Sequence, residues 1–418
     1  MAKANSKKFG LTTQVLLALI LGALVGAALN SFGYSETVDK FVVSGLFDTL
    51  GKIFFSLLQF LVVPVVLVSL TCGAASLDDI RKMGRVGGKI VSLYMLTTAL
   101  AITVALGLAE IFDPGVGFNL ETQSTFQAKE APALSQVITD IAPSNLFKSL
   151  VEANMLQIIV ASILLGLSIT LAGSAGKRLL AVLNDLNDVL MKLVHLVMSF
   201  APIGVFGLMA KVFATQGFSA FAPLASYMLV VVAALLFHAS VNYMLILKLL
   251  GRLSPVQFFK NFKEVILFAF STSSSNATLP VTLEVVEEKM GVDKKIAAFT
   301  LPLGATINMD GTAIMQGVAT VFIAQAYGIN IGLEGYLTVI FMATLASIGT
   351  AGVPSVGLVM LTMVLRQVNL PVEGVGIILG VDRLLDMSRT VVNVMGDAAM
   401  TCVVAKSEGM LDEKQFNA

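Results

Sequence analysis

The sequence contains no tryptophan and only two cysteines among 418 residues. Tryptophan is one of the aromatic residues that anchor membrane helices at the lipid–water interface, so its absence leaves phenylalanine and tyrosine for that role. Cys72 and Cys402 lie far apart in apolar segments, which excludes a disulfide framework and favours a packing role. The two histidines, His195 and His238, stand singly on apolar stretches, where a core or interfacial role is favoured over proton relay.

Charged residues are scarce as well. They make up 13% of the chain against 56% apolar residues, and the mean hydropathy is +0.87, far above the needs of a soluble core. The 27 basic and 27 acidic residues balance, so charge indicates neither a nucleic acid nor a polyanionic partner. A G-x-S-x-G elbow and a P-loop are also missing, and Ser274 has no histidine nearby in sequence, so an enzyme is not favoured.

Apolar stretches of roughly 20 residues or more recur along the chain, which is the length that a helix needs to cross about 30 Å of hydrocarbon. The sequence therefore predicts an all-α membrane protein. Six stretches indicate ordinary spans, at residues 10–32, 44–75, 90–112, 155–172, 189–213 and 227–250. The first has a basic start but no clear small-residue cleavage site, so we expect it to remain as a span.

The positions of lysine and arginine predict the orientation of these spans. Basic residues precede the first span and follow the second, fourth and sixth, which places those sides in the cytoplasm. Segment 113–145 carries Glu121, Glu130 and Asp140 against Lys129, so we expect it outside. These positions predict a multi-pass protein of the cell (inner) membrane with both termini cytoplasmic.

Beyond residue 263, polar runs interrupt the apolar pattern: FSTSSSNATLP at 270–280 and SIGTAGVPSVG at 347–357. Flanks of about ten residues are too short to span, so each run predicts a re-entrant hairpin with a non-helical tip. Their terminal charges indicate that the hairpins enter from opposite faces. Each is followed by a broken or polar span, so the pattern is an inverted repeat, which usually holds solute at the midplane. A loop-rich channel entrance is the alternative.

The last span holds five charged residues: Asp382, Arg383, Asp386, Arg389 and Asp397. Each would cost roughly 2.5 kcal/mol or more at the bilayer centre if it faced lipid. With about 100° per residue, all of them except Arg383 fall with Asn393 in a stripe of about 80°. Arg383 is expected to point away from this stripe, in a structural role or toward the cytoplasm. The stripe predicts a polar interior.

Two residues of the stripe have the chemistry to bind a zwitterion with an extra carboxylate. Arg389 has the planar fork that takes a carboxylate in two hydrogen bonds, and Asp386, nearly one turn earlier, has the charge for an ammonium group. The alternative is that Asp386 and Arg389 neutralise each other in a buried pair.

Asn393 and Asp397 lie four residues apart, so their oxygens can meet at one point, as a dehydrated hard cation requires. Asn308, Asp310 and the freed carbonyls of the interruption at 304–312 offer more oxygens. The alternative is that these groups hydrogen-bond the broken helix without an ion.

The chain contains four motifs in this order: SSS with TLP shortly after it, then NMDGTA, then GTAGVPS, and finally DRLLDMSRTVVNVMGD. Together they resemble the motifs of the dicarboxylate/amino acid:cation symporters. That family includes glutamate and aspartate transporters and excitatory amino acid transporters. The resemblance covers the whole chain. It implies eight transmembrane helices plus two re-entrant hairpins of opposite orientation, a homotrimer and an elevator mechanism. Residues 1–75 and 114–215 would include the scaffold, and 76–113 and 216–418 the transport domain. That domain would hold hairpins at about 256–290 and 331–370 and spans at about 294–327 and 374–405.

The resemblance also implies the binding residues. Substrate would contact Ser274, Ser275, Thr312, Val353, Gly357, Asp386, Arg389, Thr390 and Asn393. One sodium ion would be held by Gly304, Asn308, Asn393 and Asp397. A second would be held by Thr306, Met309, Ser347, Ile348 and Thr350. A third would be held by Tyr94, Thr97, Thr98, Asn308 and Asp310. Relatives that carry neutral substrates lack the arginine at 389, so an acidic substrate is implied.

These residues predict a secondary active symporter that moves aspartate or glutamate into the cell with sodium ions. The alternatives are a proton-coupled glutamate/aspartate or C4-dicarboxylate symporter, or an ion channel. Two departures from the family pattern matter. Many relatives carry a further arginine at one of two positions, and in this chain those positions hold Ser273 and Met387. Ser355 stands where relatives often have glycine, and the lost backbone freedom is expected to slow gate opening.

Overall fold

The computed structural model describes residues 11–75, 84–118, 145–152, 154–217, 221–347 and 356–417. Nearly all of these residues are helical, and the β-structure among them is one isolated bridge between Val292 and Leu411. This agrees with the all-α architecture predicted from composition.

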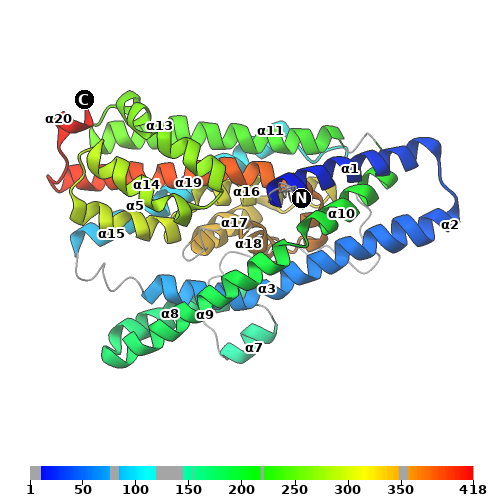
Figure 1. Ribbon diagram of the computed structural model, residues 1–418, viewed down its shortest axis with the longest axis horizontal. Coiled ribbons are helices and arrows are strands. Elements are labelled where there is room, and N and C mark those ends of the chain that lie inside the picture. The colour runs from blue at the N-terminus through cyan, green and yellow to red at the C-terminus, as the bar shows by residue number, and fades with distance from the viewer. Residues whose placement is uncertain are drawn as a thin grey trace, which may run out of the picture.

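The helices fall into two groups by their packing. The first group comprises α1 (Leu11–Phe32), α3 (Asp48–Ala75), α8 (Met155–Leu171), α9 (Ser174–Met198) and α10 (Ala201–Gln216). In it α1 packs on α10, and α3 packs on α8, α9 and α10. The second group comprises α5 (Arg85–Phe112), α11 (Phe221–Phe237), α13 (Pro255–Thr272), α14 (Ser275–Glu288), α15 (Lys294–Ile307), α16 (Asp310–Ala326), α17 (Gly332–Ser347), α18 (Val356–Gln367) and α19 (Val375–Ser407). Figure 1 shows α3, α8 and α9 along the lower side and α11, α13 and α19 along the upper side.

Short elements connect these helices. They are α2 (Glu36–Val38), the π-helix η1 (Asp39–Phe47), α7 (Leu146–Val151), the π-helix η3 (His238–Asn242), α12 (Tyr243–Ile246), the π-helix η4 (Leu247–Gly251), the 3₁₀-helix η5 (Val372–Gly374) and α20 (Glu413–Phe416). Because η3, α12 and η4 follow α11 directly, the chain stays helical from Phe221 to Gly251.

Three helical stretches of the described chain are long and apolar enough to cross a membrane, at Thr13–Phe32, Arg85–Phe112 and Ala222–Gly251. They coincide with the first, third and sixth predicted spans. Shorter apolar helices include Val160–Leu171 and Gly332–Ser347.

The predicted fifth span at 189–213 is wrong in its bounds. The chain breaks at Ser199 and Phe200, between α9 and α10. Pro202 lies in the first turn of α10, where its missing N–H costs nothing, and it therefore favours a new helix start at this point. Helix α9 begins earlier, at Ser174, and most of its residues before Leu190 are exposed. The apolar run thus covers parts of two helices.

Helices α13 and α14 fold back on each other at the serine run. Ser273 takes the left-handed conformation (φ 51°), and Ser274 caps α14 by accepting a hydrogen bond from the Ala277 N–H at 3.3 Å. Serine hydroxyls compete with helical hydrogen bonds and are favoured at such caps. Lys289, which caps the end of α14, places its Nζ 2.7 Å from Oε2 of Glu264, in the middle of α13. Helix α14 therefore runs back alongside α13.

The following helix is interrupted over two residues, Asn308 and Met309, between α15 and α16. Asn308 has extended backbone angles, and Pro302 lies one turn and a half before it. Helices α17 and α18 pack on each other and flank residues 348–355, which lie outside the described residues. Helix α19 is continuous over 33 residues and is buried along most of its length.

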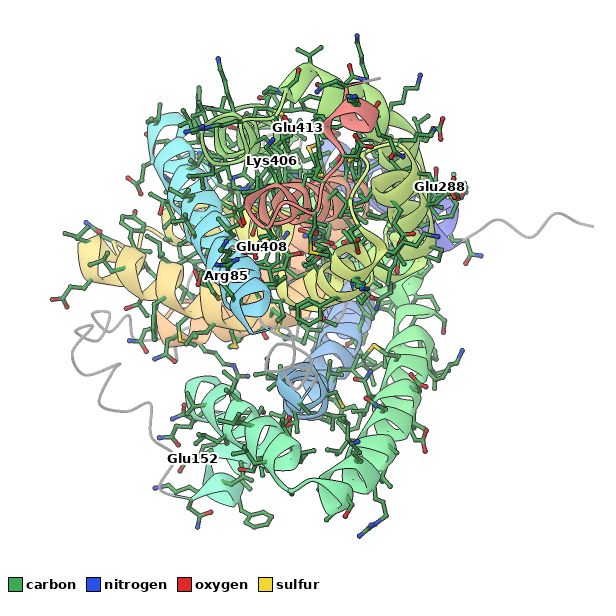
Figure 2. The ribbon with its side chains drawn as sticks, turned by 90° about the vertical axis from the view of Figure 1, so that its left-hand side faces the viewer. Arg85, Glu152, Glu288, Lys406, Glu408 and Glu413 are labelled. Carbon is green, nitrogen blue, oxygen red and sulfur yellow. The ribbon has the colours of Figure 1, made fainter. Side chains whose placement is uncertain are left out.

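The C-terminal segment forms backbone hydrogen bonds with the turn between α14 and α15. The Asp293 N–H donates to the Met410 carbonyl at 3.0 Å, and the Asp412 N–H donates to the Gly291 carbonyl at 2.8 Å. Phe416 is fully buried. Figure 2 shows this end of the molecule, where Glu408 and Arg85 lie together and Lys406 lies near Glu413.

Glu408 forms ion pairs with two basic side chains at the start of α5. Its carboxylate lies 2.5 Å from Arg85 Nη2 and 2.5 Å from Lys89 Nζ. Hydrogen bonds from Arg85 and Lys89 lower the pKa of the Glu408 carboxyl from 4.5 to about 2. This contact joins the beginning of α5 to the end of α19.

We expect Glu408→Gln to lower the melting temperature in detergent by about 1–3 °C at pH 7, because ion pairs at the surface stabilise proteins only modestly. A carboxyl with a lowered pKa in the folded state stabilises above its ordinary pKa of 4.5 and loses this effect as the pH falls toward 2. The difference between variant and wild type should therefore shrink between pH 5 and pH 2. Glu152→Gln, in an exposed pair with Lys148, is the matched control. A difference that stays constant over this range would contradict the role of Glu408.

Candidate functional site

Arg389 is the largest charged group in the interior of the second helix group, and its side chain is only 1% exposed. Its Nη2 donates to Asp386 Oδ1 at 2.6 Å, and its Nη1 lies 2.8 Å from Asp382 Oδ1. Nε of Arg389 has no hydrogen-bond partner among the described residues, and Nη1 makes an ionic contact with Asp382. A buried guanidinium with an unpartnered donor is costly, and carboxylate oxygens are the acceptors that fit it.

The start of α16 packs against this part of α19. A methyl group at Gly311 would lie 2.4 Å from the Arg389 carbonyl oxygen, so only glycine allows this approach. Gly357 at the start of α18 is also near, since a methyl group there would lie 2.8 Å from Thr312 Cγ2 and 3.7 Å from Arg389 Nη1. The structure thus brings Thr312, Gly357 and Arg389 together.

Three of the remaining predicted substrate residues, Thr390, Ser274 and Ser275, are buried. Thr390 is buried and its hydroxyl donates to the Asp386 carbonyl at 2.9 Å. Ser274 and Ser275 are buried at the α13–α14 turn, and α14 packs on α19. Val353 lies outside the described residues.

Asn393 joins the substrate residues to a group of oxygens on the broken helix. Its Oδ1 accepts from the Gly311 N–H at 2.7 Å, and its Nδ2 lies 3.3 Å from the Met309 sulfur. Asn308 Nδ2 donates to Asp397 Oδ1 at 2.9 Å and points at the Asn393 carbonyl at 3.3 Å. Three of the four predicted residues of the first cation set are therefore in direct contact.

Gly304 completes that set and links it to α5. A methyl group at Gly304 would lie 2.5 Å from Asp397 Oδ1 and 2.6 Å from the Tyr94 hydroxyl oxygen. Thr97 Oγ1 lies 3.5 Å from Asn308 Oδ1. The first and third predicted cation sets are thus adjacent, and glycine leaves room at their junction.

Asp310 is the second buried carboxylate of this region. Thr98 donates to its Oδ1 at 2.5 Å, and the Thr98 hydroxyl oxygen also lies 2.9 Å from the Tyr94 carbonyl, to which Thr97 donates at 3.0 Å. All five predicted residues of the third cation set therefore lie within one chain of contacts. Asp310 and Asp397 are fully or almost fully buried, and their side-chain partners among the described residues are threonine, tyrosine, histidine and asparagine, with no lysine or arginine.

The second predicted cation set is only partly assembled among the described residues. Ser347 accepts from the Met309 N–H at 3.0 Å and donates to the Ile307 carbonyl. Thr306 bonds to carbonyls of its own helix and is half-buried. Ile348 and Thr350 lie outside the described residues. In the part of the chain that the structure describes, no group of three or more His, Cys, Asp or Glu side chains gathers as a transition-metal site would require.

Several contacts differ from the sequence-based expectation or were not foreseen. Arg383 does not point away from the polar stripe, since its Nη1 lies 3.5 Å from Asp386 Oδ2 and its side chain is mostly buried. Its length allows it to reach around the helix. The helical spacing places Asp382 on the polar stripe but does not predict its contact with Arg389. His238 and Tyr243 contact Asp310, and only their spacing on an apolar span could have suggested it.

A model of the sodium:dicarboxylate symporter family matches residues 11–407. The chain belongs to the sodium:dicarboxylate symporter family. Members are symporters, so the chain is a membrane transport protein and not an enzyme. The helical architecture and the buried polar stripe agree with that assignment.

Individual family members are similar over almost the whole length. The proton/glutamate-aspartate symporter of Escherichia coli (strain K12) is 36% identical, with 98% of this chain and 95% of that protein covered. The proton/sodium-glutamate symport protein of Geobacillus stearothermophilus is 34% identical, with 98% and 97% covered. Excitatory amino acid transporter 3 of Oryctolagus cuniculus is 33% identical, with 96% and 87% covered.

Proposed function

We propose that this family member carries aspartate or glutamate into the cell together with sodium ions. The observation that carries the proposal is Arg389, a buried guanidinium between Asp382 and Asp386, close to Thr312 and Gly357, whose Nε has no partner among the described residues. The side-chain carboxylate of the amino acid would take the donors of Arg389, and its ammonium group would bind Asp386. The names of the relatives above, which act on glutamate and aspartate, support the same solute.

The preference for sodium rests on the oxygens of Asn308, Asn393, Asp397 and Asp310 with Tyr94, Thr97 and Thr98. Among the described residues, Asp310 and Asp397 contact no lysine or arginine, so a bound cation would offset the cost of burying their charges. Hydroxyl, amide and carboxylate oxygens suit a hard cation. Asn393 supports coupling between the ion and the solute. It contacts Gly311, one residue before the proposed solute residue Thr312, and it lies four residues from the proposed ion ligand Asp397. An ion at this place would order the residues that bind the solute.

We also infer eight transmembrane helices, two re-entrant hairpins and an elevator movement within a homotrimer. The scaffold would be the first helix group, and the transport domain would be the second. Close folding of α13 on α14 supports a hairpin. Contacts between the groups are partly apolar, such as Gly376 on Leu208 and Gly380 on Met209, which suits sliding. The inner membrane and cytoplasmic termini follow from the basic loops.

Purified protein in liposomes should accumulate labelled aspartate or glutamate when sodium is imposed outside. One sodium ion that moves down a tenfold gradient provides about 1.4 kcal/mol, enough for roughly tenfold accumulation. Uptake that responds only to a proton gradient would instead establish the proton-coupled alternative. Saturation and counterflow would exclude a channel, and stronger competition by succinate than by aspartate would favour a C4-dicarboxylate.

A further inference from the structure

A π-helical turn interrupts the sixth predicted span beside the cation residues. Helix η3 covers His238–Asn242, and the Tyr243 N–H donates to the His238 carbonyl five residues earlier. In an α-helix, residues five apart point about 140° away from each other. The wider π-turn brings such residues close to one face, and π-turns occur frequently at functional sites. The rings of His238 and Tyr243 are accordingly neighbours, with centroids 4.4 Å apart.

Both side chains reach the same oxygen of Asp310. His238 Nε2 lies 3.1 Å from Asp310 Oδ2, and the Tyr243 hydroxyl donates to that oxygen at 2.8 Å. Thr98 donates to the opposite oxygen, Oδ1, at 2.5 Å. All four residues are fully buried, so water cannot replace any of these contacts at low cost.

Asn242 determines which nitrogen of His238 carries the proton. Its Nδ2 lies 2.8 Å from His238 Nδ1 and donates to it, which makes Nδ1 the acceptor and Nε2 the donor to Asp310. The imidazole can therefore be neutral and still hold the carboxylate. Asn242 and His238 are four residues apart within the same π-turn, so the backbone fixes this arrangement.

Tyr243 also ties Asp310 to α19. Its hydroxyl lies 3.2 Å from the Val392 carbonyl, and a methyl group at Gly396 would lie 2.4 Å from the Tyr243 oxygen. The carboxylate of Asp310 is thus held on one side by η3 and α12, and α12 is in turn tied to α19 through Tyr243. Its Oδ1 remains directed toward Thr98 and the third cation set.

We propose that His238 and Tyr243, aligned by the π-turn and with the tautomer set by Asn242, are positioning residues that orient Asp310 for cation binding. The inference rests on the proposed function, because it takes Asp310 as a sodium ligand. It adds residues that the family resemblance did not supply. Their effect is on the affinity for sodium, whereas the solute contacts of Arg389 are left intact.

The test is binding of labelled aspartate to the purified full-length protein at graded sodium concentrations. His238→Leu should raise the half-saturating sodium concentration by about tenfold or more, as expected for loss of a hydrogen bond to a charged group. The aspartate affinity at saturating sodium should change by less than about threefold, well below the effect of such a loss. His238→Gln, which keeps an N–H donor, should recover most of the sodium affinity. Tyr243→Phe, which keeps the ring, should also weaken sodium binding.

Ser240→Ala is the matched control, because Ser240 belongs to the same π-turn, is exposed and bonds only to the Leu236 carbonyl among the contacts described. Its sodium dependence should equal that of the wild type. Equal shifts in His238→Leu and His238→Gln would overturn the proposal, since packing volume and not the donor would then matter. Unchanged sodium dependence in Tyr243→Phe and His238→Leu would overturn it as well. Sodium-independent binding by the wild type would instead reject the proposed function itself.

Discussion

Arg389→Cys should lower aspartate and glutamate uptake by at least about 100-fold, because loss of one partner of a buried, hydrogen-bonded charge pair typically costs several kcal/mol. The substitution removes the only guanidinium that contacts both Asp382 and Asp386 among the described residues. Small neutral amino acids need no such partner, so their binding should persist. Initial rates of labelled aspartate and serine uptake in liposomes measure both effects.

The matched control is Arg366→Cys, which removes an exposed arginine at the end of α18 and should leave uptake unchanged. Because loss of Arg389 removes the guanidinium that contacts both Asp382 and Asp386, the double variant with Asp382→Asn guards against failure to fold. Normal aspartate uptake by a folded Arg389→Cys protein would disprove the carboxylate role. The same result would support mutual neutralisation of Asp386 and Arg389 as the reason for the pair.

Asp397→Asn should raise the sodium concentration for half-maximal uptake by at least about 100-fold, since it removes a buried anionic ligand with almost no change in volume. Asn308 Nδ2 donates to Asp397 Oδ1, and the amide at 397 would retain an oxygen for this contact. The charge is therefore the main quantity that changes. Uptake measured against sodium at fixed aspartate provides the comparison.

Asp185→Asn on the exposed side of α9 is the corresponding control and should behave like the wild type. If the half-maximal sodium concentration of Asp397→Asn is unchanged, Asp397 is not a sodium ligand. Uptake that becomes dependent on protons alone would point to the proton-coupled alternative.

Sequence reasoning located most helices closely because length and polarity determine them locally. The first hairpin was predicted at about 256–290, and α13 and α14 run from Pro255 to Glu288. The last span was predicted at about 374–405, and α19 covers Val375–Ser407. The fifth span failed because an apolar run continues through a helix break, and hydropathy alone does not register the turn before Pro202.

The site was predictable where one helix carries it and not where several helices meet. Helical spacing was enough to place Asp386, Arg389, Asn393 and Asp397 on one face. The pairing of His238 and Tyr243 with Asp310 depends on a π-turn, which shifts the register and has no clear signature in composition. Arg383 was misjudged because a long side chain can reach a neighbour that its backbone direction does not suggest.

The continuity of α19 has a mechanical consequence. Arg389 and Asp397 are eight residues apart on it, about 12 Å along the axis at 1.5 Å per residue. An unbroken helix of hydrogen-bonded turns resists bending and stretching, so any displacement moves both residues by nearly the same distance. If the proposed movement occurs, a solute held at one level and an ion held at the other would therefore arrive at the opposite side in a single step.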